Sequence, residues 1–180
     1  MEAEHCTFLA ENTLVQIKPN FNDQVLHLIC GDVGPFEAGM PVSVPLWVAI
    51  NLKRRHKCEI IPPEWMDIEE IKRMIVAETE SPFFTEIPPY FFEISHLLLE
   101  NAVDDIAETD QVKTFVQDLW DKRVAKMRTS TMKFLSQFDS CHAQLNDVTQ
   151  LEIAYAKPSI LASMARISEL HSNFQKLTPS

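Results

Sequence analysis

Two pairs of neighbouring residues are the places where this sequence could perform acid–base or nucleophilic chemistry. Asp104 and Asp105 would supply paired carboxylates, and Cys141 with His142 would place a thiol beside a base. Adjacent residues of a helix point about 100° apart, however, and sequence neighbours rarely bring their side chains into contact. We therefore interpret the two aspartates as a solvated surface pair, and Cys141 as a core thiol beside a surface imidazole.

Motifs that bind phosphates or metals, or that activate a nucleophile, do not occur in the 180 residues. All three glycines lie between Gly31 and Gly39, and their spacing fits neither a dinucleotide-binding turn nor a P-loop. There is no Cys-x-x-Cys, His-Glu-x-x-His or Gly-x-Ser-x-Gly segment. The sequence therefore predicts no catalytic residue, no cofactor and no metal site.

Two basic clusters remain as candidate binding residues. The first reads Lys-Arg-Arg-His-Lys from Lys53 to Lys57. It either complements the negative C-terminal end of a helix or binds nucleic acid, and it could also serve as a nuclear-import signal. The second cluster follows a long helix, and it forms either a solvated face or a surface for an acidic protein partner. Its members are Lys122, Arg123, Lys126, Arg128 and Lys133.

The overall charge argues against tight, unassisted binding to nucleic acid. The chain carries 16 basic and 26 acidic residues, a net charge of −10, whereas such binding needs many phosphates to be neutralised. The acidic residues are concentrated between Glu59 and Gln111, which suggests a chain that orients itself against partners. No apolar run is long enough to span a bilayer, and the acidic N-terminus predicts no leader peptide. Four scattered cysteines indicate reduced thiols in the cytosol or nucleus.

Glycine and proline divide the chain into two parts. Nine of the eleven prolines precede Tyr90, and none lies between Tyr90 and Lys157. This predicts an α+β fold that is mostly α: a small β-containing domain over 1–62, followed by a helical-bundle domain over 63–180. We expect strands at 14–17, 25–30, 42–44 and 58–61, with 42–44 at a sheet edge. Residues 45–55 fit either a strand or a helix, and the helix is favoured.

The second part has the apolar spacing of four helices. The first covers 65–75 and is followed by a polar loop at 77–82, and the third runs from about 109 to 139. We expect a connector at 146–156 and a last helix that opens at Pro158. The apolar residues assigned to the inner face of this last helix are Ile160, Leu161, Met164, Ile167 and Leu170.

The second of these helices, at 90–102, is apolar on nearly every face. Such a helix must be buried on all sides, and a small domain offers little interior for that, so a protein partner is the expected second wall. We assign Phe91, Ile94 and Leu98 to the chain's own core. The residues expected to face a partner are Tyr90, Phe92 and Leu99 on this helix, with Lys122, Arg123 and Lys126 on the next.

Several segments together resemble a known family. They are Gly31-Asp-Val-Gly-Pro-Phe36, Val44-Pro-Leu-Trp-Val-Ala-Ile-Asn-Leu-Lys53, Lys57-Cys58, Pro62-Pro-Glu-Trp-Met66, Leu97-Leu98-Leu99 and Val116-Gln-Asp-Leu-Trp-Asp-Lys-Arg123. In this order and spacing they are similar to the family of second Psf subunits of the eukaryotic GINS complex. Each motif is weak by itself, and the shared order over nearly the whole chain carries the resemblance.

The resemblance implies a function without catalysis. GINS is a nuclear heterotetramer of four related subunits, each with a helical domain and a small β domain. It joins the MCM ring and a RecJ-like cell-division-cycle co-activator to form the replicative DNA helicase. ATP hydrolysis belongs to the ring, so this chain would act as a brace that favours the closed assembly. The resemblance thus implies three sister subunits, the ring and the co-activator as partners. The net charge and the short apolar runs add the expectation that direct DNA contact is weak or absent and that there is no membrane partner.

Overall fold

A three-stranded antiparallel sheet organises the N-terminal part of the computed structural model, which describes residues 3–29, 31–136 and 146–177. Strand β1 (Leu14–Pro19) alternates exposed and buried residues, with Val15 and Ile17 facing the core. It is the central strand, between β4 (Val42–Pro45) and β5 (Cys58–Ile61). Three expected strands are therefore present, and β4 lies at an edge as predicted.

The expected strand at 25–30 is shorter in the structure. Strand β2 (Leu26–Leu28) pairs with β3 (Gly31–Val33) in a separate two-stranded sheet, with Leu26 opposite Val33. Because β3 follows so closely in sequence, the chain has to reverse direction soon after Leu28, and β2 cannot extend further. Cys30 lies outside the described residues.

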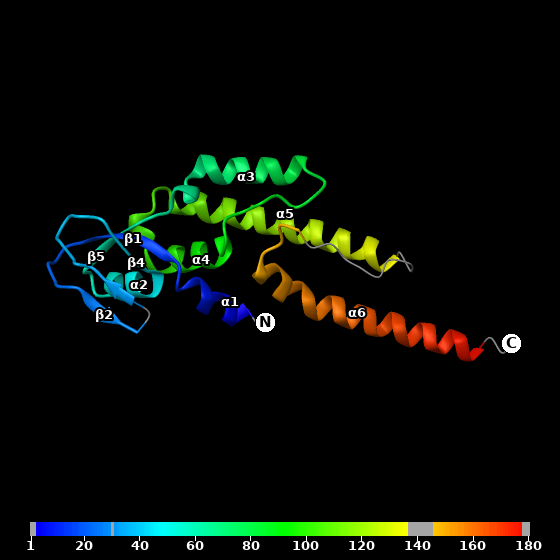
Figure 1. Ribbon diagram of the computed structural model, residues 1–180. Helices are drawn as coiled ribbons and strands as arrows, with labels where there is room; N and C mark the ends of the chain where they lie inside the picture. The colour runs from blue at the N-terminus through cyan, green and yellow to red at the C-terminus, as the bar shows by residue number, and fades with distance from the viewer. Residues whose placement is uncertain (1–2, 30, 137–145, 178–180) are drawn as a thin grey trace.

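Residues 45–55 form a helix, as the sequence favoured. Helix α2 (Leu46–Arg54) begins after Pro45, whose fixed backbone torsion suits a helix start. Its buried face carries Leu46, Ala49 and Ile50 and packs on β1, β4 and β5. A short helix, α1 (Ala3–Ala10), precedes the sheet. Together, α2 and the sheet form the small N-terminal unit seen beside the helical part in Figure 1, whereas α1 packs against two helices of the helical part.

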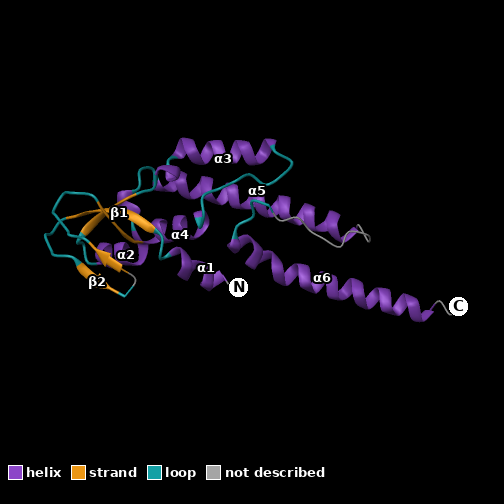
Figure 2. Cartoon of the chain, viewed as in Figure 1, coloured by secondary structure: helices purple, strands orange, loops and turns teal. Residues whose placement is uncertain are grey.

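Within the described residues, the helical part contains four α-helices: α3 (Ile68–Glu80), α4 (Phe91–Asn101), α5 (Thr109–Ser136) and α6 (Gln150–Leu177). Short 3₁₀ turns at Glu64–Met66 and Val103–Asp105 join them to their neighbours. Helices α3 and α5 pack along each other, whereas α6 leaves the body at its N-terminal end and extends beyond the other helices (Figures 1 and 2). The 28 residues of α5 make it about 42 Å long.

Helix α4 lies between the two parts of the chain and is covered by both. It packs against α1 and α2 on one side and against α5 on the other. A single apolar core runs through this contact and includes Ile17, Ile60, Phe91, Leu98 and Leu119. The chain's own elements therefore bury most of α4, and the expectation that a partner must supply its second wall is wrong. The division at residues 62 and 63 stays a prediction.

Two helix boundaries differ from the sequence-based expectation. Helix α3 continues to Glu80, through part of the expected loop at 77–82, because Glu78 is buried and ion-paired inside the chain. Helix α6 begins at Gln150 and contains Pro158 instead of starting there. Its start is fixed by a capping box, in which Thr149 Oγ1 accepts from the Glu152 N–H at 3.3 Å and Glu152 Oε2 accepts from the Thr149 N–H at 2.8 Å.

Candidate functional site

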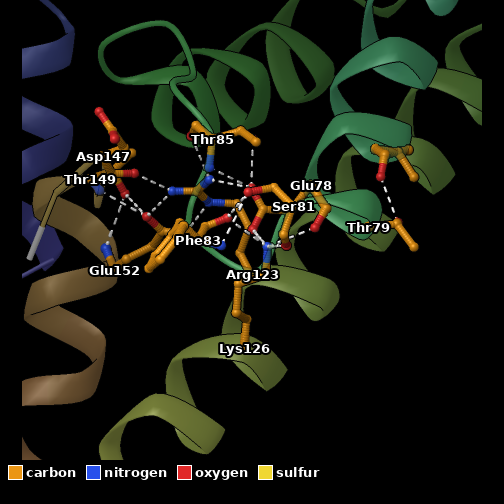
Figure 3. Close-up of polar contacts among 11 residues, drawn as sticks. Glu78, Thr79, Ser81, Phe83, Thr85, Arg123, Lys126, Asp147, Thr149 and Glu152 are labelled. Carbon is orange, nitrogen blue, oxygen red and sulfur yellow. Dashed lines mark hydrogen bonds and ion pairs between the residues drawn. The ribbon is translucent and has the colours of Figure 1, made fainter.

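A set of buried ion pairs is centred on Arg123. Arg123 lies on α5 and has no exposed surface. It reaches Glu78 near the end of α3 and Glu152 in the first turn of α6 (Figure 3). Three helices that are far apart in sequence thus meet at one guanidinium.

Every N–H of the Arg123 guanidinium has an acceptor. Nε donates to Glu152 Oε1 at 2.6 Å, and Nη2 donates to Glu152 Oε2 at 3.1 Å and to the Asp147 carbonyl at 2.6 Å. Nη1 donates to Glu78 Oε2 at 2.8 Å and to the Thr85 carbonyl at 2.9 Å. A guanidinium has five donors, so the buried charge is fully satisfied within its own chain.

Lys126, one turn further along α5, binds the loop that follows α3. Its ammonium pairs with Glu78 and donates to the carbonyl oxygens of Glu78, Ser81 and Phe83. The ring of Phe84 lies 5.1 Å from Arg123 Cζ and 5.8 Å from Lys126 Nζ, within the range of cation–π attraction. These contacts hold residues 81–85 against α5.

The electrostatics of Glu78 follow from these neighbours. Burial by itself would raise the pKa of this carboxyl, but hydrogen bonds from Lys126 and Thr85 and the charge of Arg123 outweigh that effect. The pKa of Glu78 is therefore lowered, and the side chain is held as a carboxylate. The arrangement fixes helices and offers no open position for a substrate.

The structure corrects the sequence-based assignment of Arg123. Sequence reasoning placed it with Lys122 and Lys126 on a face available to a partner, but Arg123 is enclosed by Glu78, Glu152 and the Asp147 carbonyl. Lys122 is exposed, and Lys126 is partly buried against the loop. The Thr149-x-x-Glu152 capping box was a readable sign that a helix starts at Gln150, but no sequence pattern linked Glu78 to Arg123.

The assignments on α4 are confirmed in part. Phe91, Ile94 and Leu98 are buried in the chain's own core, as predicted. Phe92 is also buried, with 6% of its surface exposed, and packs edge-on against Trp120 with ring centroids 4.9 Å apart. The expectation that Phe92 faces a partner is therefore wrong in this chain, because α5 supplies its neighbour.

Tyr90 and Leu99 remain candidates for contact with a partner. Tyr90 precedes α4 in a left-handed backbone conformation, with φ of 56°, and is half-buried. Leu99 is also half-buried at the edge of the core. Their contact with a partner, like that of Lys122, stays a prediction.

The first basic cluster is partly engaged within the chain. Lys53 Nζ binds Asp105 Oδ1 at 2.6 Å, and Asp105 Oδ2 also accepts from the Ile60 N–H at 2.8 Å. Arg54 Nε donates to Asn101 Oδ1 at 3.0 Å. Asp105 thus joins α2 and β5 to the turn after α4, which corrects its interpretation as a solvated surface acid. Within the cluster, Lys53 is partly buried, whereas Arg54, Arg55, His56 and Lys57 are exposed.

The other candidates for chemistry gain no support from the described residues. Cys141 and His142 lie outside them. Within the residues that the structure describes, no three His, Cys, Asp or Glu side chains are grouped so that they could hold a metal ion. No described helix is long and apolar enough to cross a membrane.

An exposed row of apolar side chains lies along α6. Leu161 is 55% exposed, Met164 46% and Ile153 39%. With the half-buried Ile160 and Ile167 they recur at helical spacing, and we call these five residues the α6 stripe. The expected inner face of the last helix also included Leu170 in place of Ile153. That expectation is wrong for the isolated chain, in which Leu161, Met164 and Leu170 are exposed, because α6 extends away from the other helices (Figure 1). Large exposed apolar patches on proteins are commonly sites of contact with other proteins.

Both parts of the chain match known protein families. Residues 2–61 match the family described as "PSF2 N-terminal domain". Residues 65–171 match the family described as "GINS complex protein helical bundle domain". The two matches follow each other in the order that the fold shows.

Whole-chain relatives agree with these matches. The chain is 46% identical over 178 residues to a protein of Brugia malayi named "Probable DNA replication complex GINS protein PSF2", covering 99% of this chain and 94% of the relative. It is 44% identical to the human "DNA replication complex GINS protein PSF2", covering 98% and 95% of the two chains. A Drosophila melanogaster relative is 37% identical over 93% of this chain and 83% of its own. Together with the two family matches, these identities show that the chain belongs to the PSF2 family of GINS complex proteins.

Proposed function

We propose that the chain is one of four subunits of a nuclear GINS complex, which joins the MCM ring and a RecJ-like cell-division-cycle co-activator in the replicative DNA helicase. The PSF2 family is non-catalytic, so the contribution of the chain is binding energy. A brace that binds one conformation of an assembly more tightly than the others raises the population of that conformation. Three sister subunits, the ring and the co-activator are the partners that this function requires.

The single observation that carries the proposal is the exposed α6 stripe. Burying apolar surface contributes about 25 cal/mol per Å², so covering five large side chains supplies several kcal/mol to an association. The stripe lies on α6, and the Arg123–Glu152 ion pair holds the N-terminal end of this helix against α5. Its position therefore suits a sister subunit that packs along α6 as in a helical bundle.

A pair of substitutions on opposite faces of α6 tests this proposal. Met164→Glu places a charge within the stripe, and Ala162→Glu places the same charge on the opposite face, where Ala162 is also exposed. We expect Met164→Glu to prevent recovery of the chain with its three co-expressed sister subunits, and Ala162→Glu to leave recovery unchanged. Equal recovery of both variants would show that the stripe is not the contact surface.

The second candidate function is a stand-alone nucleic-acid-binding module that uses Lys53 to Lys57. The exposure of Arg55 and Lys57 favours it. Against it stand the internal contacts of Lys53 and Arg54 and the net charge of −10. Binding of the isolated chain to DNA with a steep salt dependence would support this candidate over the first.

A further inference from the structure

An acidic cleft of about 370 Å³ opens between the start of α4 and the segment that leads into α6. Glu86, Tyr90 and Glu93 line one side, and Asp147 and Gln150 line the other. The remaining lining residues are Ile87, Pro89, Val148 and Thr149. No lysine, arginine or histidine is among these nine residues, so all the charged groups of the lining are negative.

Glu93 is the unusual member of this lining. Only 4% of its surface is exposed, and neither Oε1 nor Oε2 has a hydrogen-bond partner among the described residues. Burial raises the pKa of this carboxyl, and the charge of Glu152 raises it further; the nearby backbone of Glu93 lowers it but does not outweigh them. An unpaired buried carboxyl is costly to ionise, so a native site of this kind requires an explanation.

The described residues that line the cleft bring no cation to Glu93. Helix α1 packs against α4 and brings the buried thiol of Cys6, whose pKa Glu93 helps to raise. Helix α6 brings Glu152, whose carboxylate is already paired with Arg123 and Thr149. Glu86 and Asp147 add further negative charge at the rim. The complementary group is therefore a cation from outside the described part of the chain.

We propose that the cleft receives a lysine or arginine side chain of a sister subunit, which forms an ion pair with Glu93 in the assembled complex. Ile87, Pro89 and Val148 would contact the aliphatic stem, while Glu86 and Asp147 attract the charged end. The described residues include no cluster of metal-ligand type, which favours a basic side chain over a bound metal ion. Gln150 lines the cleft and is the first residue of α6. The cleft therefore lies at the N-terminal end of the helix that carries the α6 stripe. The identity of the partner rests on the proposed function.

The test compares two neutral substitutions on the same helix. Glu93→Gln removes the buried charge, and Glu100→Gln removes an exposed charge from α4 as a matched control. The affinity of each full-length variant for the three co-purified sister subunits is measured by titration. We expect Glu93→Gln to weaken binding on the order of 30-fold, as for loss of a buried ion pair, and Glu100→Gln to leave binding unchanged.

A second variant separates partner recognition from folding. Glu93→Leu removes a polar group that has no partner in the free chain, so we expect its thermal unfolding in dilute solution to occur at the wild-type temperature or above it. We expect the same variant to bind the sister subunits as weakly as Glu93→Gln. Wild-type affinity in both variants would overturn the inference and leave the proposed function intact, whereas failure of the wild-type chain itself to bind the sister subunits would overturn the proposed function.

Discussion

Arg123 Nε lies 2.6 Å from Oε1 of Glu152, and both side chains are closed off from solvent. This ion pair joins the middle of α5 to the first turn of α6, and Asp147 and Thr149 extend it to the segment before α6. The direction in which α6 leaves the body therefore depends on this guanidinium together with the packing of α6 against α1 and α5. Because α6 carries the apolar stripe, the same contact also positions the proposed partner surface.

Removing Arg123 should be among the most damaging single changes. Arg123→Ala leaves Glu152 buried without its cation and leaves Glu78 with Lys126 alone, which costs about 3–5 kcal/mol of unfolding free energy. Lys122→Ala, at the exposed neighbouring position, should change it by less than about 0.5 kcal/mol. Urea unfolding in dilute solution, followed by far-ultraviolet circular dichroism, measures both values. Similar midpoints for the two variants would show that the buried ion pairs contribute little.

The lowered pKa of Glu78 predicts a loss of stability in acid. A carboxyl whose pKa is lower in the folded chain than in the unfolded chain contributes stability that is fully present above the unfolded value of about 4.3. That contribution is lost as the pH falls through the folded value, when Glu78 becomes protonated. Glu78→Gln should therefore be less stable than wild type at pH 7, and the difference should shrink below about pH 4. Thermal unfolding from pH 7 to pH 3 measures it, and a constant difference would contradict the assignment.

Phe92 and Leu99 should respond differently to a buried charge. Phe92→Asp places a carboxylate against Trp120 in the core and should unfold the chain, since an unpaired buried charge costs several kcal/mol. Leu99→Asp, at the half-buried edge, should retain helical content and weaken assembly with the sister subunits. Circular dichroism and pull-down distinguish the two outcomes, with the exposed His96→Asp as a control on the same helix. Normal assembly of the Leu99 variant would remove Leu99 from the interface.

The basic cluster should contribute little to DNA binding by the assembled complex. Simultaneous replacement of Arg54, Arg55 and Lys57 by Glu should leave any such affinity largely unchanged, because the net charge of −10 opposes DNA binding. Titration of the complex with duplex DNA at several salt concentrations is the measurement. Loss of most of the affinity, with a flatter salt dependence, would favour the nucleic-acid function.

The elements that sequence reasoning placed correctly are those whose local signals agree. Strand β1 alternates buried and exposed residues, and α2 begins directly after Pro45. Helix α5 was expected from about 109, and it begins at Thr109. In these segments, backbone preference and apolar spacing favour the same secondary structure. Tertiary contacts therefore stabilise the structure that the local sequence already favours.

The errors lie where long-range contacts decide the structure. Phe92 is off the main apolar stripe of α4, but it is buried because Trp120 of α5 packs against it. Arg123 belongs to a run of basic residues in sequence, but Glu78 and Glu152 approach it from 45 and 29 residues away. A polar residue at helix spacing is normally solvated, and only its distant partners allow it to be buried. The α6 stripe shows the reverse case, because its spacing indicates a buried face that the chain alone does not cover.

The mass of the purified chain, alone and with its three sister subunits, tests the central claim most directly. Light scattering coupled to size-exclusion chromatography should show that the chain alone self-associates or aggregates, because the α6 stripe lacks its cover. With the sister subunits it should elute as a single complex that contains one copy of each chain. A monodisperse, cooperatively folding monomer that does not join the sister subunits would contradict the account.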